Sequence, residues 1–185
     1  MTDTQKKPLW KNELVWLFLI TSGLFAILYS KFILGGYAYV FTDTGADTMQ
    51  INYAQYGLFS SLFRSGESGY VLQAGLGMDV SSYYPAYMIP YNLLILLAPQ
   101  RLLPWAVLAS AYLKMITISL VGYLFYRKLM QDGIGTMAAA LAWTFSGYVI
   151  LWGQHYGFCT CMALFTVFMY FLQCYLNGEQ RWKSA

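Results

Sequence analysis

Four apolar segments dominate the pattern of hydrophobic and polar positions along this chain. They cover residues 14–34, 102–126, 134–152 and 158–176. A helix needs about 20 apolar residues to cross a hydrocarbon core about 30 Å thick, and helices satisfy their own backbone hydrogen bonds there. The pattern predicts four transmembrane helices in an all-α, polytopic membrane bundle that forms a single domain over residues 1–185.

A fifth apolar run, residues 87–98, is too short to span the membrane. Pro85, Pro90 and Pro99 bracket it, and proline lacks the backbone N–H that a helix interior needs. We therefore expect a short re-entrant or interfacial piece inside a long outer loop, residues 36–100.

Within this outer loop, residues 47–64 have the pattern of an amphipathic helix. Asp47, followed three residues later by Gln50, resembles a capping box. Apolar residues then recur at three- and four-residue steps, which places them in one stripe. The stripe consists of Met49, Tyr53, Tyr56, Phe59 and Phe63. We expect this helix to lie in the outer interface, with its aromatic side in the acyl boundary.

Composition and charge agree with a membrane protein and predict its orientation. The chain is 58% hydrophobic and 10% charged, whereas soluble domains have roughly 25% charged residues. Four spans with both termini in the cytoplasm place most basic residues inside, as the positive-inside rule requires. These are Lys6, Lys7, Lys11, Arg127, Lys128, Arg181 and Lys183. Topology thus explains the net charge of +3 without a nucleic-acid partner.

Two acids at the start of the outer loop are the leading candidates for chemistry. Asp43 and Asp47 are four residues apart, at a predicted membrane surface. A carboxylate there can act as a general base towards a hydroxyl or bind a divalent cation, and Asp47 is the candidate metal ligand. A structural interpretation stands beside this one, with Asp43 in a turn and Asp47 as a helix cap.

Four further polar residues are candidates for substrate binding. Lys114 stands in the second apolar segment, where an ammonium normally faces a polar cavity, forms a structural ion pair or snorkels. Gln154 and His155 lie in the outer turn GQHYG, where they can contact an anionic group or serve only as interfacial polar residues. Asp79, in the outer loop, can line a cavity on the outer side together with these residues, or it can be a solvated loop residue.

The remaining motifs exclude several classes of protein. Cys159, Cys161 and Cys174 fall in or beside one apolar segment, so we expect free thiols rather than a zinc site or a disulfide framework. The sequence contains no GxSxG, HExxH, P-loop or Rossmann fingerprint. A nucleotide enzyme of the soluble type is therefore disfavoured.

Five stretches of the chain occur in an order that carries a family resemblance. They are TDTGADTMQINYAQY, GLGMD, SSYYPAYMIPYNLLILLAP, AYLKMITISLVGYLFYR and LAWTFSGYVILWGQH. Together they resemble the N-terminal part of the YfhO family of bacterial multispanning membrane proteins, which is related to the GT-C class of glycosyltransferases. The resemblance covers nearly the whole chain from about Leu14 onward.

The resemblance implies an enzyme of the bacterial cell membrane with a GT-C-like fold. Such an enzyme takes a sugar from a polyprenyl-phosphate carrier at the outer face and adds it to a cell-envelope glycopolymer such as lipoteichoic acid. By this likeness Asp43 or Asp47 would be the base or the metal-associated carboxylate, and Lys114 and His155 would contact the carrier phosphate.

The chain departs from the family in length, because family members have more spans than the four predicted here. We therefore expect a fragment of a larger protein, with the missing C-terminal half as a partner. The alternatives are a non-enzymatic membrane scaffold, a transport or assembly subunit, or an inactive truncated product.

The predicted topology places Ser68 and Ser184 on opposite sides of the membrane. In a background without native cysteines, Ser68→Cys is expected to react with an impermeant thiol reagent added to intact cells. Ser184→Cys is expected to react only after the cells are opened. Labelling of both cysteines from the same side would contradict four spans.

Overall fold

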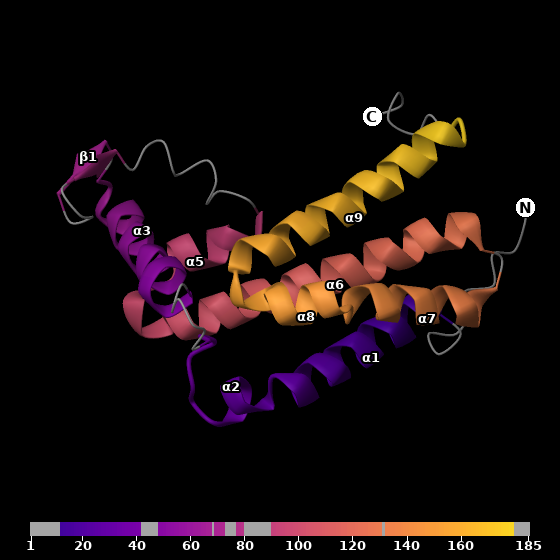
Figure 1. Cartoon of the computed structure of the whole chain (residues 1–185), viewed down its shortest axis with the longest axis horizontal. Helices are drawn as coiled ribbons and strands as arrows, with labels where there is room; N and C mark the ends of the chain where they lie inside the picture. The colour runs from indigo at the N-terminus through magenta and orange to yellow at the C-terminus, as the bar shows by residue number, and fades with distance from the viewer. Residues whose placement is uncertain are drawn as a thin grey trace, which may run out of the picture.

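An elongated bundle of helices, with a smaller layer of short elements at one end, forms the described part of the chain (Figure 1). The computed structural model describes residues 12–41, 48–67, 69–72, 77–79, 90–130 and 132–179. The predicted all-α architecture is confirmed for these residues, apart from one two-stranded hairpin.

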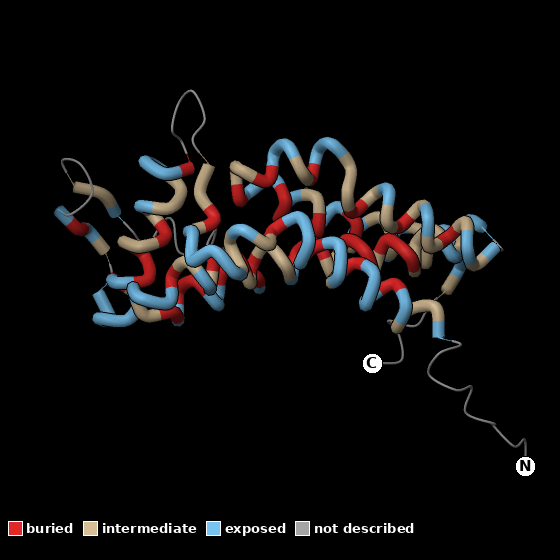
Figure 2. The backbone as a smooth tube through the Cα atoms, turned by 90° about the horizontal axis from the view of Figure 1, so that it is seen from below, coloured by how far each residue is buried: buried red, intermediate tan, exposed pale blue. Residues whose placement is uncertain are grey.

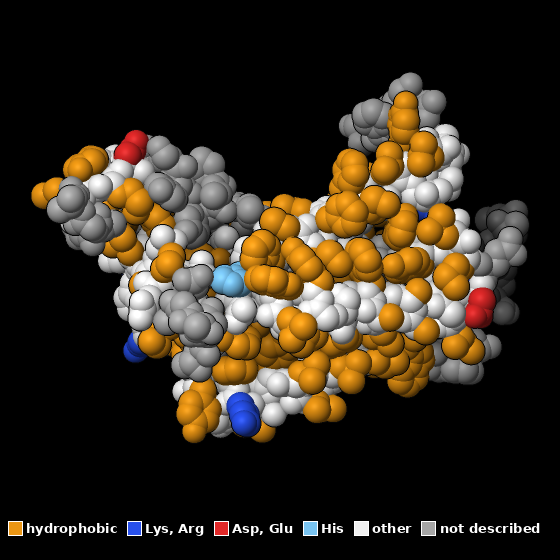
Figure 3. Space-filling model, viewed as in Figure 1, with side chains coloured by type: hydrophobic (Ala, Val, Ile, Leu, Met, Phe, Trp, Pro, Cys, Tyr) orange, Lys and Arg blue, Asp and Glu red, His pale blue; other side chains and the backbone are white. Residues whose placement is uncertain are grey.

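The central helix of the bundle is α6 (Leu103–Leu129). It packs against three other helices, α1 (Glu13–Leu28), α7 (Gly133–Thr144) and α9 (Tyr156–Leu176). In the most apolar part of the helical stretch that contains α6, 50% of the residues are buried. The corresponding share is 22% in each of the two apolar stretches that follow in sequence. Buried positions accordingly gather along the inside of the bundle (Figure 2), whereas hydrophobic side chains cover the outer face of α7 to α9 (Figure 3). Such a surface suits a lipid environment.

In the described part of the chain, three helical stretches are long and apolar enough to cross a membrane. They are Gln100–Leu129, Gly133–Gln154 and Tyr156–Leu176. The predicted helices over residues 102–126, 134–152 and 158–176 are therefore confirmed as helices of membrane-spanning length. The middle stretch is not one continuous α-helix, because α7 is followed after a short break by α8, Gly147–Leu151, and the 3₁₀ turn Trp152–Gln154.

The first predicted segment, residues 14–34, is not one helix. It consists of α1 and a separate short helix, α2, Ser30–Leu34, with Tyr29 between them. The side chain of Asn12 caps the N-terminus of α1. With 16 residues, α1 is about 24 Å long, shorter than a hydrocarbon core of about 30 Å. A fourth span therefore stays a prediction.

The short elements at one end of the bundle, which we call the loop layer, contain the predicted interfacial helix. A π-helical turn, Thr48–Tyr53, continues into α3, Ala54–Ser65, and Gly66 ends this helix with a left-handed backbone at φ 72°. The bounds agree with the predicted helix over residues 47–64. The apolar stripe begins later than predicted, because Met49 is 50% exposed.

Two more pieces complete the loop layer. The strands β1, Tyr70–Val71, and β2, Met78–Asp79, pair antiparallel. After the 3₁₀ turn Pro90–Asn92, the five-residue helix α5, Leu93–Leu97, packs against α3 and α6. In the described part of the run 87–98, the helix is thus too short to span a membrane, as predicted.

Polar side chains join the long helices at several depths. Thr21 and Ser119 form a buried hydroxyl pair at 2.7 Å, and Trp143 Nε1 donates to Thr166 Oγ1 at 2.9 Å. At the end of the bundle away from the loop layer, Lys128 forms an ion pair with Glu179 at 2.6 Å. Apolar burial gives little drive for helix association in lipid, so such contacts and close packing hold the helices together.

Removing one member of the buried pair Thr21–Ser119 should destabilise the bundle. Thr21→Val and Ser119→Ala are each expected to cost about 1 kcal/mol, because each leaves a buried hydroxyl without its partner. The double variant should cost less than the sum, measured as unfolding free energies in detergent. Thr117→Val is the matched control, since Thr117 donates to Leu113 of its own helix. Strict additivity would contradict the pair.

Candidate functional site

Lys114 reaches the end of the bundle that carries the loop layer, although it stands inside the long helix α6. Its side chain is 2% exposed, and its Nζ donates to the carbonyl oxygen of Tyr156 at 3.1 Å. Tyr156 is the first residue of α9. Side chains on a helix tilt towards its N-terminus, which for α6 is the loop-layer end. The ammonium therefore lies at the level of the turn between α8 and α9.

A small cavity borders the ammonium. Its volume is about 10 Å³, close to the space that one water molecule needs. The polar part of its wall contains Ser110 and Lys114 from α6, together with Tyr39, Tyr56 and Tyr156. The rest of the wall is mainly apolar, so this is a small, mostly apolar cavity with a few polar groups in its wall.

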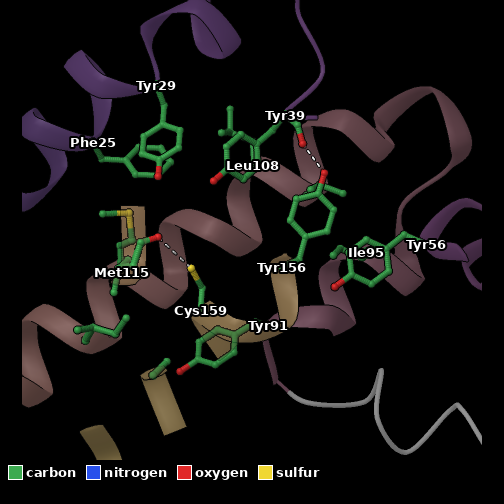
Figure 4. Close-up of a cluster of buried hydrophobic side chains, with 14 of the residues drawn as sticks. Phe25, Tyr29, Tyr39, Tyr56, Tyr91, Ile95, Leu108, Met115, Tyr156 and Cys159 are labelled. Carbon is green, nitrogen blue, oxygen red and sulfur yellow. Dashed lines mark hydrogen bonds between the residues drawn. The ribbon is translucent and has the colours of Figure 1, made fainter. Parts of the chain in front are cut away.

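Three of the four tyrosines in the cavity wall come from segments that are far apart in sequence, and they cover the cavity together (Figure 4). The hydroxyl of Tyr156 donates to the carbonyl oxygen of Tyr39. The ring of Tyr56, from α3, stacks on that of Tyr156 with centroids 5.4 Å apart and planes 13° apart. The loop after α2, the helix α3 and the start of α9 are thereby held together.

Neutral groups surround Lys114 in the described part of the chain. No described carboxylate forms an ion pair with it. Burial raises the pKa of the Tyr39 hydroxyl well above its ordinary value, and the neighbouring Tyr29 adds to this rise. Tyr39 therefore stays protonated at physiological pH and supplies no negative charge. Of the alternatives for Lys114, an ion pair with a described acid is not observed.

The turn that contains Gln154 and His155 lies beside the cavity. Gly153 is part of the cavity wall. The backbone oxygen of Gln154 accepts a hydrogen bond from Thr48 Oγ1 at 2.9 Å. The ring of His155 packs against Trp152 with a centroid distance of 5.7 Å. The structure thus brings Lys114 and this turn together, while both turn side chains remain half-buried.

Asp79 does not join this group. It lies exposed on β2, in the hairpin that forms the far end of the loop layer, and it is not part of the cavity wall (Figure 1). Proximity to Lys114 therefore does not support a substrate-binding role for Asp79.

Asp43 and Asp47, including the predicted metal ligand, lie outside the described residues. Their described neighbours in sequence lie close to the cavity. The ring of Phe41 is 5.1 Å from that of Tyr39, and Thr48 is the buried donor to the Gln154 carbonyl. Among the described residues, no group of three or more His, Cys, Asp or Glu side chains could hold a metal ion.

Two components of the site were not predicted from the sequence. Ser110 precedes Lys114 by four residues, a spacing that places both on one face of a helix, so this signal was present. The tyrosine cover carried no comparable signal, because Tyr39, Tyr56 and Tyr156 come together only through the tertiary fold. The three cysteines are free thiols, as expected.

The described residues thus form a helical protein with three apolar helical stretches of membrane-spanning length and a buried lysine beside a small cavity. No family model, curated protein or solved structure matches the chain.

Gly153, in the turn before α9, and Gly157, in the first turn of α9, should respond differently to alanine. A Cβ on Gly153 would lie 3.1 Å from the hydroxyl oxygen of Tyr39, which is tightly packed, whereas a Cβ on Gly157 meets nothing within 4 Å. Gly153→Ala should lower the unfolding free energy by about 1 kcal/mol through overpacking. Gly157→Ala should be neutral or raise it by up to about 0.5 kcal/mol. Equal effects in a detergent unfolding assay would contradict the tight contact.

Proposed function

We propose that this chain is the N-terminal part of a GT-C-like membrane glycosyltransferase. The enzyme would move a sugar from a polyprenyl-phosphate carrier to a cell-envelope glycopolymer, such as lipoteichoic acid, at the outer face of the bacterial cell membrane. The proposal rests on the resemblance to the YfhO family and on one structural observation. That observation is the buried Lys114 ammonium, which has no described carboxylate partner and lies beside the turn between α8 and α9.

The charge on Lys114 supports an anionic ligand. Removing an ammonium from water is unfavourable, and one neutral carbonyl offsets this only in part. A polyprenyl phosphate carries its negative charge at the boundary between hydrocarbon and water, because its chain stays in the membrane. Its phosphate therefore matches Lys114 in both charge and depth, and His155 and Gln154 are the adjacent polar residues.

The acids before Thr48 supply the second half of the proposed reaction. Thr48 directly follows Asp47 in sequence and bonds to the turn beside the cavity. In the proposed step, Asp43 or Asp47 accepts the proton of an acceptor hydroxyl, alone or with a divalent cation. The new glycosidic bond forms as the bond between the sugar and the phosphate oxygen breaks, and the carrier phosphate leaves with the electron pair.

The proposed topology has four spans, with α1 as the first and both termini in the cytoplasm. The loop layer then lies outside, as the proposed chemistry requires. Arg127 and Lys128 lie at the opposite end of α6, which would be the cytoplasmic end under the positive-inside rule.

A membrane scaffold or assembly subunit is the second candidate. The size of the cavity favours it, because about 10 Å³ holds one water molecule and not a substrate. Under this interpretation Lys114 has a structural role, since its hydrogen bond joins α6 to the start of α9.

Neutralising the two acids distinguishes these functions. In the host, at the protein's native length, Asp43→Asn or Asp47→Asn should reduce envelope glycosylation at least about 100-fold, as expected for a lost general base. The amount of protein inserted in the membrane should not change. Glu67→Gln is the matched control, because it neutralises another acid of the same loop. Unchanged sugar content in both aspartate variants would support the scaffold.

A further inference from the structure

Ser110 is a buried hydroxyl without a hydrogen-bond partner. It is 1% exposed, its Oγ contacts no donor or acceptor, and it lines the cavity beside Lys114. Other buried hydroxyls of the bundle, such as Thr144 and Thr166, donate to carbonyl oxygens four residues earlier. An unpartnered buried polar group in a native structure requires an explanation, and a polar atom that enters the cavity supplies one.

The two α6 side chains at the cavity present hydrogen-bond donors to the same small space. An ammonium has three N–H donors, and Lys114 uses one of them on the Tyr156 carbonyl. The Ser110 hydroxyl is a second donor, one helical turn away. The space between them admits about one oxygen atom. Two donors, one of them charged, best complement an oxygen that only accepts hydrogen bonds and bears negative charge.

We propose that Ser110 and Lys114 together bind one non-bridging oxygen of a lipid-linked phosphate, with Ser110 as the second donor. This inference rests on the proposed function and adds a binding residue to it. The cavity has room for one oxygen and not for a whole phosphate, which makes the contact specific to a single oxygen. Buried apolar residues complete the wall, among them Ile95 and Val107, and they offer the ammonium no hydrogen-bond acceptor.

Binding of polyprenyl monophosphate to the full chain in phosphatidylcholine nanodiscs tests this pair. Ser110→Ala should weaken binding roughly 10-fold, the effect of losing one hydrogen bond to a charged group. Lys114→Gln should weaken it roughly 100-fold. Lys128→Gln, which removes a positive charge from the other end of the same helix, should leave the Kd unchanged.

Stability provides an independent control on Ser110. Because its hydroxyl has no partner in the folded protein, Ser110→Ala should leave the unfolding midpoint unchanged or raise it. A weaker Kd with an unchanged midpoint would therefore show a lost ligand contact rather than a damaged fold.

The remaining outcomes separate this inference from the proposed function. If the unaltered chain binds polyprenyl phosphate and Ser110→Ala binds it equally well, the role of Ser110 is overturned and the proposed donor stands. If the unaltered chain does not bind it, the proposed donor itself is overturned. Equal binding of polyprenol without phosphate would overturn the oxygen contact. Binding of inorganic phosphate with the same dependence on Ser110 would retain the pair but identify free phosphate as its ligand.

Discussion

The hydrogen bond from Lys114 to the carbonyl of Tyr156 determines how the loop-layer end of the bundle is arranged. A buried ammonium must have a hydrogen-bond acceptor, and this one finds it on the first residue of α9. The bond fixes the start of α9 against α6. Tyr156 then provides a ring for Tyr56 and a hydroxyl for the Tyr39 carbonyl. The packing of α3 and of the loop after α2 therefore depends on a residue that Lys114 positions.

The same principle applies along the rest of the bundle. Some of the buried polar side chains of the described long helices meet across helix boundaries. Thr21 pairs with Ser119, and Trp143 pairs with Thr166. Close to the other end, Tyr123 donates to Glu13, and Lys128 pairs with Glu179 beyond it. Polar contacts thus fix the helix register at several depths, while the apolar surface between them stays suited to lipid.

The helices of the second half could be predicted from the sequence because each is a long apolar run with clear ends. The break at Tyr29 could not, because the apolar pattern continues through it. The ring of Tyr29 packs edge-on against that of Tyr39 in the loop after α2, a contact that the local pattern does not contain. The hairpin of β1 and β2 was missed for another reason, since two-residue strands are too short to show alternation.

The site shows the same division between local and tertiary information. Lys114 was identifiable because a charge in an apolar segment is rare. Its depth was not, because this depends on which way α6 runs and on where α9 begins. The four-residue spacing places Ser110 on the same face of the helix as Lys114. This spacing indicates a binding residue only once the structure shows that a cavity borders both side chains. The contribution of Asp43 and Asp47 remains a prediction from sequence, supported by the position of Thr48 next to the turn.

The composition of the cavity decides how Lys114 should be interpreted. Met115, the next residue, is also buried and packs without any polar requirement. A methionine at position 114 would fill similar space and avoid the cost of removing an ammonium from water, since apolar replacements of buried charges are often neutral or stabilising. A hydrogen bond to one neutral carbonyl offsets only part of that desolvation free energy. The unpartnered hydroxyl of Ser110, four residues earlier in α6, is a second unfavourable group. Two unfavourable groups that face one small cavity have a common explanation if an anionic oxygen enters it.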